Sequence, residues 1–174
     1  MASDDKGRTS SSRAEMYLGL RGKALNVKAA DIRLTPELAV EPYGIVMDMD
    51  IDGRTATFVA FATGEASVYL STGGGTIGAG QASQDVSVAA KEFVAAAKPY
   101  VPAMAKVSEH PLPGVGEITF YVLTPGGVHT ATRLERALGE GNEALSPLFY
   151  AGHRLMTQIR RLDEQQTKEP QQRN

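Results

Sequence analysis

The chain has 174 residues, 42% hydrophobic and 22% charged, which is the size and composition of one ordinary globular domain. Its formal net charge of −2 and its pI of about 5.9 offer no overall positive field to attract nucleic acid or an anionic membrane. It contains no cysteine, which excludes disulfides, thiol nucleophiles and cysteine-ligated metals.

The two ends of the chain differ in composition from its middle. Residues 1–13 and 163–174 are polar, and they cannot bury enough apolar area to offset the entropy of ordering. We therefore expect two disordered tails and a single domain over residues 14–162. The sequence has neither a signal peptide nor an apolar stretch of about 20 residues, so we expect no membrane association and a cytoplasmic protein, with a composition typical of bacteria.

The first elements follow from hydrophobic periodicity. Apolar residues recur at helical spacing between Tyr17 and Val27, which predicts a helix over 14–32. Strict alternation then predicts a strand over 43–51 with one buried face and one solvated face. The pair Asp52-Gly53 is favoured in type I′ turns and predicts a tight hairpin.

The remaining elements complete the pattern. A strand apolar on both faces is predicted over 55–63, and a shorter one over 67–71. Ser83 or Asp85 can cap the helix that follows the glycine-rich run. The later elements are a helix ending at Ala97, strands over 117–123 and 128–134, and a helix over 145–162.

The predicted order is therefore α-β-β-β-α-β-β-α. Hairpins dominate the connections, so we expect an α+β fold with a mostly antiparallel five-stranded sheet packed by helices. This element order is similar to that of the bacterial type III secretion chaperones, and profilin-like and roadblock-like domains have related orders. The resemblance to the chaperones implies a small acidic dimer that binds partner peptides.

A glycine-rich run between the third strand and the second helix is the main candidate site. The run spans residues 71–80, and its candidate site residues are Ser71, Thr72, Gly73, Gly74, Gly75, Thr76, Gly78 and Gly80. The run matches G-x-G-x-x-G, but a dinucleotide site needs a parallel βαβ unit, which the predicted hairpins do not provide. Gln81-Ala82 replaces the lysine and hydroxyl residue of a phosphate-binding P-loop. The run is interpreted as a mobile connection, a device at the sheet edge, or a loop that contacts a partner or ligand.

Other chemistry-bearing residues show no specific pattern. Asp48, Asp50 and Asp52 resemble the start of a calcium loop, but Val59 stands where the twelfth-position acid is required. We interpret these carboxylates as a solvated strand face. The histidines (His110, His129 and His153) have no zinc-ligand spacing, and no serine nucleophile elbow is present. We expect no metal, no cofactor and no catalytic residue.

Two functions remain open from the sequence. The first is a non-enzymatic protein-interaction domain of chaperone or adaptor type, expected to be a homodimer with a protein or peptide partner. Its partner surface is expected on the sheet or on the last helix. The second is a small-molecule-binding protein or enzyme in which the loop Gly73–Gly80 forms one wall of a pocket. An enclosed cavity beside Gly73–Gly80 with convergent polar groups favours the second, and a flat apolar surface shared by two copies favours the first.

Overall fold

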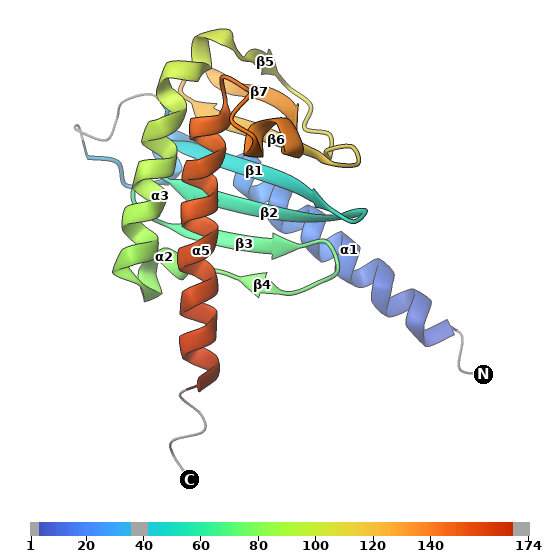
Figure 1. Ribbon diagram of the computed structural model, residues 1–174. Helices are drawn as coiled ribbons and strands as arrows, with labels where there is room; N and C mark the ends of the chain where they lie inside the picture. Colours follow the sequence, from blue (N-terminus) through green and yellow to red (C-terminus); the bar gives the residue numbers. More distant parts are fainter. Residues whose placement is uncertain (1–3, 36–41, 169–174) are drawn as a thin grey trace.

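The computed structural model describes residues 4–35 and 42–168, with side chains from residue 11 onward. One sheet runs through the molecule in the order β4-β3-β2-β1-β6-β7-β5. Every neighbouring pair of strands is antiparallel. Helices lie against both faces of this sheet (Figure 1). The α+β class and the antiparallel sheet are therefore confirmed.

The sheet has seven strands rather than the five that we predicted. The strands are β1 (Gly44–Ile51), β2 (Arg54–Phe61), β3 (Ala66–Leu70), β4 (Gly75–Thr76), β5 (Ala105–Val107), β6 (Glu117–Thr124) and β7 (Gly127–Leu134). The two unpredicted strands, β4 and β5, contain two and three residues and form the edges of the sheet. Such short strands carry no readable alternation, so the predicted element order is wrong at these positions.

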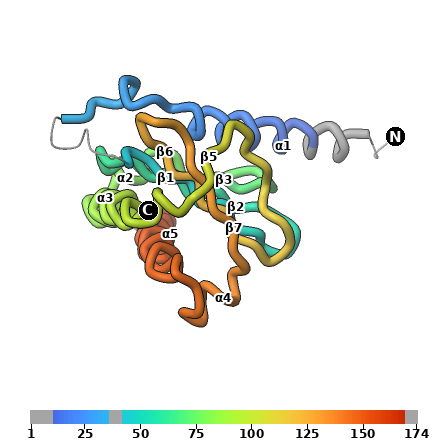
Figure 2. Tube along the Cα trace, turned by 90° about the horizontal axis from the view of Figure 1, so that it is seen from above, coloured from blue at the N-terminus to red at the C-terminus, as the bar shows by residue number. Residues whose placement is uncertain are grey.

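Long helices cover the sheet on two sides. The helical segments are α1 (Asp4–Leu25), η1 (Ala29–Asp31), α2 (Ala79–Ala82), α3 (Gln84–Ala97), η2 (Lys98–Ala103), α4 (Glu135–Gly139) and α5 (Ser146–Lys168). Helices α3 and α5 lie on one face, and α1 lies on the other (Figures 1 and 2). Helices α1 and α5 extend into residues 4–13 and 163–168, which we had expected to belong to the tails.

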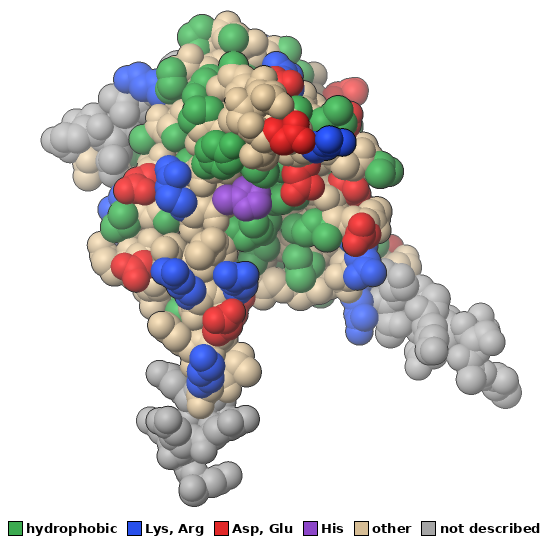
Figure 3. All heavy atoms as spheres, viewed as in Figure 1, with side chains coloured by type: hydrophobic (Ala, Val, Ile, Leu, Met, Phe, Trp, Pro, Cys, Tyr) green, Lys and Arg blue, Asp and Glu red, His purple; other side chains and the backbone are tan. Residues whose placement is uncertain are grey.

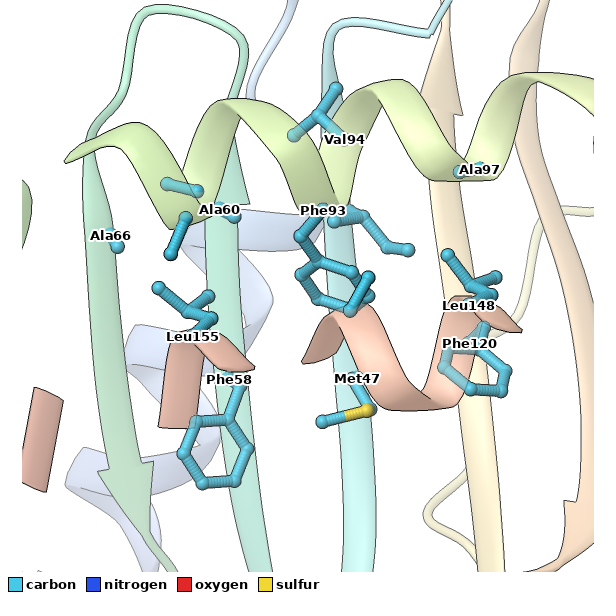
Figure 4. Close-up of a cluster of buried hydrophobic side chains, with 14 of the residues drawn as sticks. Met47, Phe58, Ala60, Ala66, Phe93, Val94, Ala97, Phe120, Leu148 and Leu155 are labelled. Atoms are coloured by element: carbon cyan, nitrogen blue, oxygen red, sulfur yellow. The ribbon is translucent and has the colours of Figure 1, made fainter. Parts of the chain in front are cut away.

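Because both faces are covered, the molecule has two apolar cores. In the larger core, Phe93 of α3 and Leu155 of α5 point toward Met47 and Phe58 of the sheet (Figure 4). The smaller core lies under α1 and the segment that follows it, around Tyr121. The solvated face predicted for the first strand is therefore wrong at its centre, since helix α1 buries it.

Local signals from the sequence agree with the observed ends of several elements. Asp52 and Gly53 both have positive φ, 53° and 75°, so the predicted type I′ hairpin between β1 and β2 is confirmed. The Ser83 side chain accepts a hydrogen bond from the Val86 N–H and caps α3.

Candidate functional site

The first part of the glycine-rich run forms a hairpin at the edge of the sheet. The Gly73 N–H donates to the Leu70 carbonyl, and the Leu70 N–H donates to the Gly74 carbonyl. Gly75 has a φ of 131°, and a Cβ atom at this position would overlap the Val68 carbonyl oxygen. Only glycine fits there without strain. Its missing Cβ atom lets the backbone of β4 come close enough to pair with β3.

The second part of the run connects this hairpin to α2. The Gly78 N–H donates to the Ser67 hydroxyl, and Gly80 lies against the Gly64 carbonyl with no room for a Cβ atom. The neighbouring strands β2, β3 and β4 pair antiparallel. The run therefore does not join parallel strands, and it does not have the geometry of a dinucleotide-binding loop.

Beside this hairpin lies an open groove of about 520 Å³, which we call the α1 groove. One wall is helix α1, through Arg13, Met16, Tyr17 and Leu20. The other wall is formed by strand β3 and the turn that follows it, through Val68, Tyr69, Leu70, Thr72, Gly73, Gly74, Gly75 and Ile77. The volume falls in the range of known binding pockets, about 300–1,000 Å³.

The groove is mainly apolar, and several of its side chains are open to solvent. Ile77 is 69% exposed, Met16 is 64% exposed and Leu70 is 37% exposed. Isolated exposed apolar residues are common on protein surfaces, but here three of them line the same groove. Arg13 is the one charged residue among the side chains that line it.

The hydroxyl of Tyr17 points away from the groove, toward the sheet. The Thr57 hydroxyl donates to Asp48 at 2.6 Å, so its single proton is used there. Tyr17 therefore donates to the Thr57 oxygen, 2.8 Å away. Burial is the main reason that the pKa of Tyr17 is raised above its ordinary value. Tyr17 thus contributes ring surface to the groove rather than a free polar group.

Helix α1, which forms one wall, is attached to the sheet by a buried ion pair. The Arg21 guanidinium donates two hydrogen bonds to one carboxylate oxygen of Asp48. It also donates to the carbonyls of His110 and Pro111 in the loop before β6. Burial disfavours the charge of Arg21, but the bonds to Asp48 outweigh this cost and raise the pKa of the guanidinium.

The structure divides the predicted site residues into two groups. Thr72, Gly73, Gly74 and Gly75 line the α1 groove. The other four make contacts that support the fold and lie outside the lining. Ser71 Oγ accepts from the Thr55 N–H, Thr76 donates to Asp163 of α5, and Gly78 and Gly80 hold α2 against β3 and the preceding turn.

Sequence reasoning did not include several residues of the groove. Arg13 lay in a segment that we had expected to be a tail, and Ile77 was the apolar member of the glycine-rich run that we did not select. Met16 lies outside the helical stripe that contains Tyr17 and Leu20. An apolar residue outside the buried stripe of a helix was the available signal for an exposed contact surface.

The predicted carboxylate cluster is structural. Asp48 is buried, and Asp50 accepts hydrogen bonds from the N–H groups of Gly53 and Gly116. Within the described parts of the chain, no three His, Asp or Glu side chains are grouped in a way that could hold a metal ion. Basic and acidic side chains are interspersed on the α3–α5 side and do not form a patch of one sign (Figure 3).

None of the helices in residues 4–35 and 42–168 is both long and apolar enough to span a membrane. Comparison with known protein families, curated proteins and solved structures finds no match to this chain. The similarity of element order to the secretion chaperones therefore stays a prediction.

Proposed function

We propose that this chain is a non-enzymatic protein-interaction domain that binds an apolar peptide segment of a partner protein in the α1 groove. The observation that carries the proposal is the exposed apolar lining contributed by Met16, Leu70 and Ile77. Burying such surface is the main source of affinity when apolar groups associate.

The charge at the groove indicates the chemistry of the segment. Arg13 lines the groove and forms no ion pair with any side chain that the structure describes. An acidic residue beside the apolar residues of the segment would pair with this guanidinium. We therefore expect a segment with two or three large apolar side chains and one carboxylate.

The distribution of polar groups favours this function over catalysis. Tyr17 uses its hydroxyl inside the sheet, and the remaining side-chain polar groups of the lining are Arg13, Tyr69 and Thr72. Thr72 is exposed and Tyr69 is half-buried, and neither hydroxyl is hydrogen-bonded to a base among the described side chains. An activated nucleophile requires such a neighbour.

A small apolar molecule is the second candidate occupant, because the groove volume of about 520 Å³ suits a drug-sized ligand. The glycine-rich turn then forms one wall of its pocket, through Thr72 to Gly75. The exposure of Met16, Leu70 and Ile77 favours the peptide, since a small-molecule pocket encloses most of its ligand.

A peptide selection tests the proposal. Immobilised full-length protein is offered a displayed library of random peptides, and enriched peptides are synthesised and titrated. We expect peptides with several large apolar residues and an acidic residue. Leu70→Glu and Ile77→Glu should each weaken binding by about tenfold or more, because a carboxylate is placed in the apolar lining.

Val88→Glu is the matched control. Val88 is an apolar residue 45% exposed on α3, on the opposite face of the sheet. The proposal requires that this variant bind the selected peptides like the wild type. It is overturned if no peptide is enriched, or if Leu70→Glu and Ile77→Glu bind the peptides unchanged. Binding of a fluorescent apolar dye alone, blocked by the same two variants, would instead support the small-molecule candidate.

A further inference from the structure

The outward face of helix α1 is a second surface that no other described segment covers. Tyr17, Arg21 and Ala24 point to the sheet and are buried. A helix turns by about 100° per residue, so the residues opposite them are centred on Gly19. This outward face contains Ser12, Glu15, Met16, Gly19, Gly22 and Lys23.

Large apolar side chains lie on this face and at its margin. Met16 is 64% exposed, and Leu18, beside Gly19, is 50% exposed. A Cβ atom at Gly19 or Gly22 would have no described atom within 4 Å, so no contact within the described residues requires glycine at either position. Glycine destabilises a helix relative to alanine, but it lets a second helix approach closely.

The charges on this face are arranged symmetrically about Gly19. Glu15 precedes Gly19 by four residues, and Lys23 follows it by four. Neither forms an ion pair with any side chain that the structure describes. Each lies about 6 Å from Gly19 along the helix axis, given a rise of 1.5 Å per residue. An antiparallel copy of the helix therefore presents Lys23 at the height of Glu15, and Glu15 at the height of Lys23.

We propose that two copies of this chain form a homodimer through the outward faces of their α1 helices. The helices lie antiparallel and cross at Gly19, and Glu15 of each copy pairs with Lys23 of the partner subunit. Such an interface is isologous, because the same patch of both copies meets itself. Met16 of each copy then lies near Gly22 of the partner subunit, where the missing Cβ leaves room.

The inference does not rest on the proposed function. The α1 groove lies on the flank of the helix formed by Arg13, Tyr17 and Leu20. Met16 is the residue that both surfaces share, so it is left unchanged in the test. The peptide test uses variants at Leu70 and Ile77, and the dimer test uses variants at Glu15, Gly19 and Lys23, so failure of one proposal is distinguishable from failure of the other.

Charge exchange tests the dimer. Sedimentation equilibrium of the full chain measures the dimer dissociation constant for the wild type, Glu15→Lys, Lys23→Glu and the double variant. We expect each single variant to raise the constant by about tenfold, because like charges then face each other twice in the dimer. The double variant restores opposite charges across the interface. Its dimer dissociation constant should therefore lie within about threefold of the wild-type value.

Two further variants separate the interface from other effects. Glu92→Lys on α3 changes the net charge as Glu15→Lys does, and it should leave the dissociation constant unchanged. Gly19→Leu has space for its side chain within one copy, so it should fold as a monomer. The proposal is overturned if the wild type is monomeric at millimolar concentration, or if its dimer is unaffected by Glu15→Lys, Lys23→Glu and Gly19→Leu.

Discussion

The Arg21 guanidinium lies 2.6 Å from the Asp48 carboxylate, and both side chains are buried between helix α1 and the sheet. The two residues are 27 positions apart in the sequence, one on α1 and the other on β1. Through the same guanidinium, the loop that precedes β6 is joined to α1. The ion pair therefore holds helix α1, one wall of the α1 groove, against the sheet whose strand β3 contributes to the other wall.

Removing one partner of this pair should destabilise the fold strongly. Arg21→Met leaves the buried Asp48 carboxylate without its cation, and we expect a loss of about 3–5 kcal/mol in the free energy of unfolding. Urea denaturation of both proteins at neutral pH measures this difference. The double variant Arg21→Met/Asp48→Leu should lose less than the single variant, because no unpaired charge is then buried. A double variant less stable than Arg21→Met would contradict this account.

Stability should fall as the solution becomes mildly acidic. Burial lowers the pKa of His110 and of His153 below 6.5, and the charge of Arg21 lowers that of His110 further. Below pH of about 6.5 the unfolded chain therefore binds protons that the folded chain does not, and the free energy of unfolding decreases as pH falls. The urea concentration at the midpoint of unfolding, measured between about pH 5 and pH 7.5, should therefore decrease as the pH falls.

The double variant His110→Gln/His153→Gln identifies the source of that slope. Glutamine does not titrate, so the variant should show a shallower decrease over the same interval than the wild type. An equal slope in the two proteins would assign the acid sensitivity to other groups.

Replacement of two helical glycines by alanine should change the stability of the fold in opposite directions. Gly80→Ala places a methyl group against the Gly64 carbonyl, and we expect a loss of about 1–3 kcal/mol from the crowding. Gly19→Ala meets no atom within 4 Å and should stabilise the isolated chain by about 0.5–1 kcal/mol. Thermal unfolding at a low protein concentration compares the two. Equal shifts of the same sign would show that the packing at Gly80 is not as described.

Periodicity predicted the elements that are long enough to show it. Strand β1 and its type I′ turn, helix α3 with its Ser83 cap, and helix α5 all lie where the pattern indicates. Strands β4 and β5 are too short to alternate. Their pairing depends on contacts with β3 and β7 that no local pattern contains.

The groove was predicted only in part, for a related reason. Alternation along β1 predicted that Asp48 faces solvent. In the structure Arg21 of α1 lies against Asp48, and no sequence pattern indicates this contact. Once α1 covers that face, Met16 and the turn Thr72–Gly75 become neighbours across one groove. Proximity between residues so far apart in the sequence arises from tertiary packing, which a single sequence does not specify.

Because the native chain has no cysteine, one introduced thiol can report on the groove alone. Thr72→Cys, labelled with an environment-sensitive dye and titrated with a peptide selected on the wild type, should give a saturable change in emission. The change should disappear when Ile77→Glu is added, and it should be absent when the thiol is placed at Val88 instead. No change at residue 72, or the same change at residue 88, would contradict the claim that the α1 groove binds the partner segment.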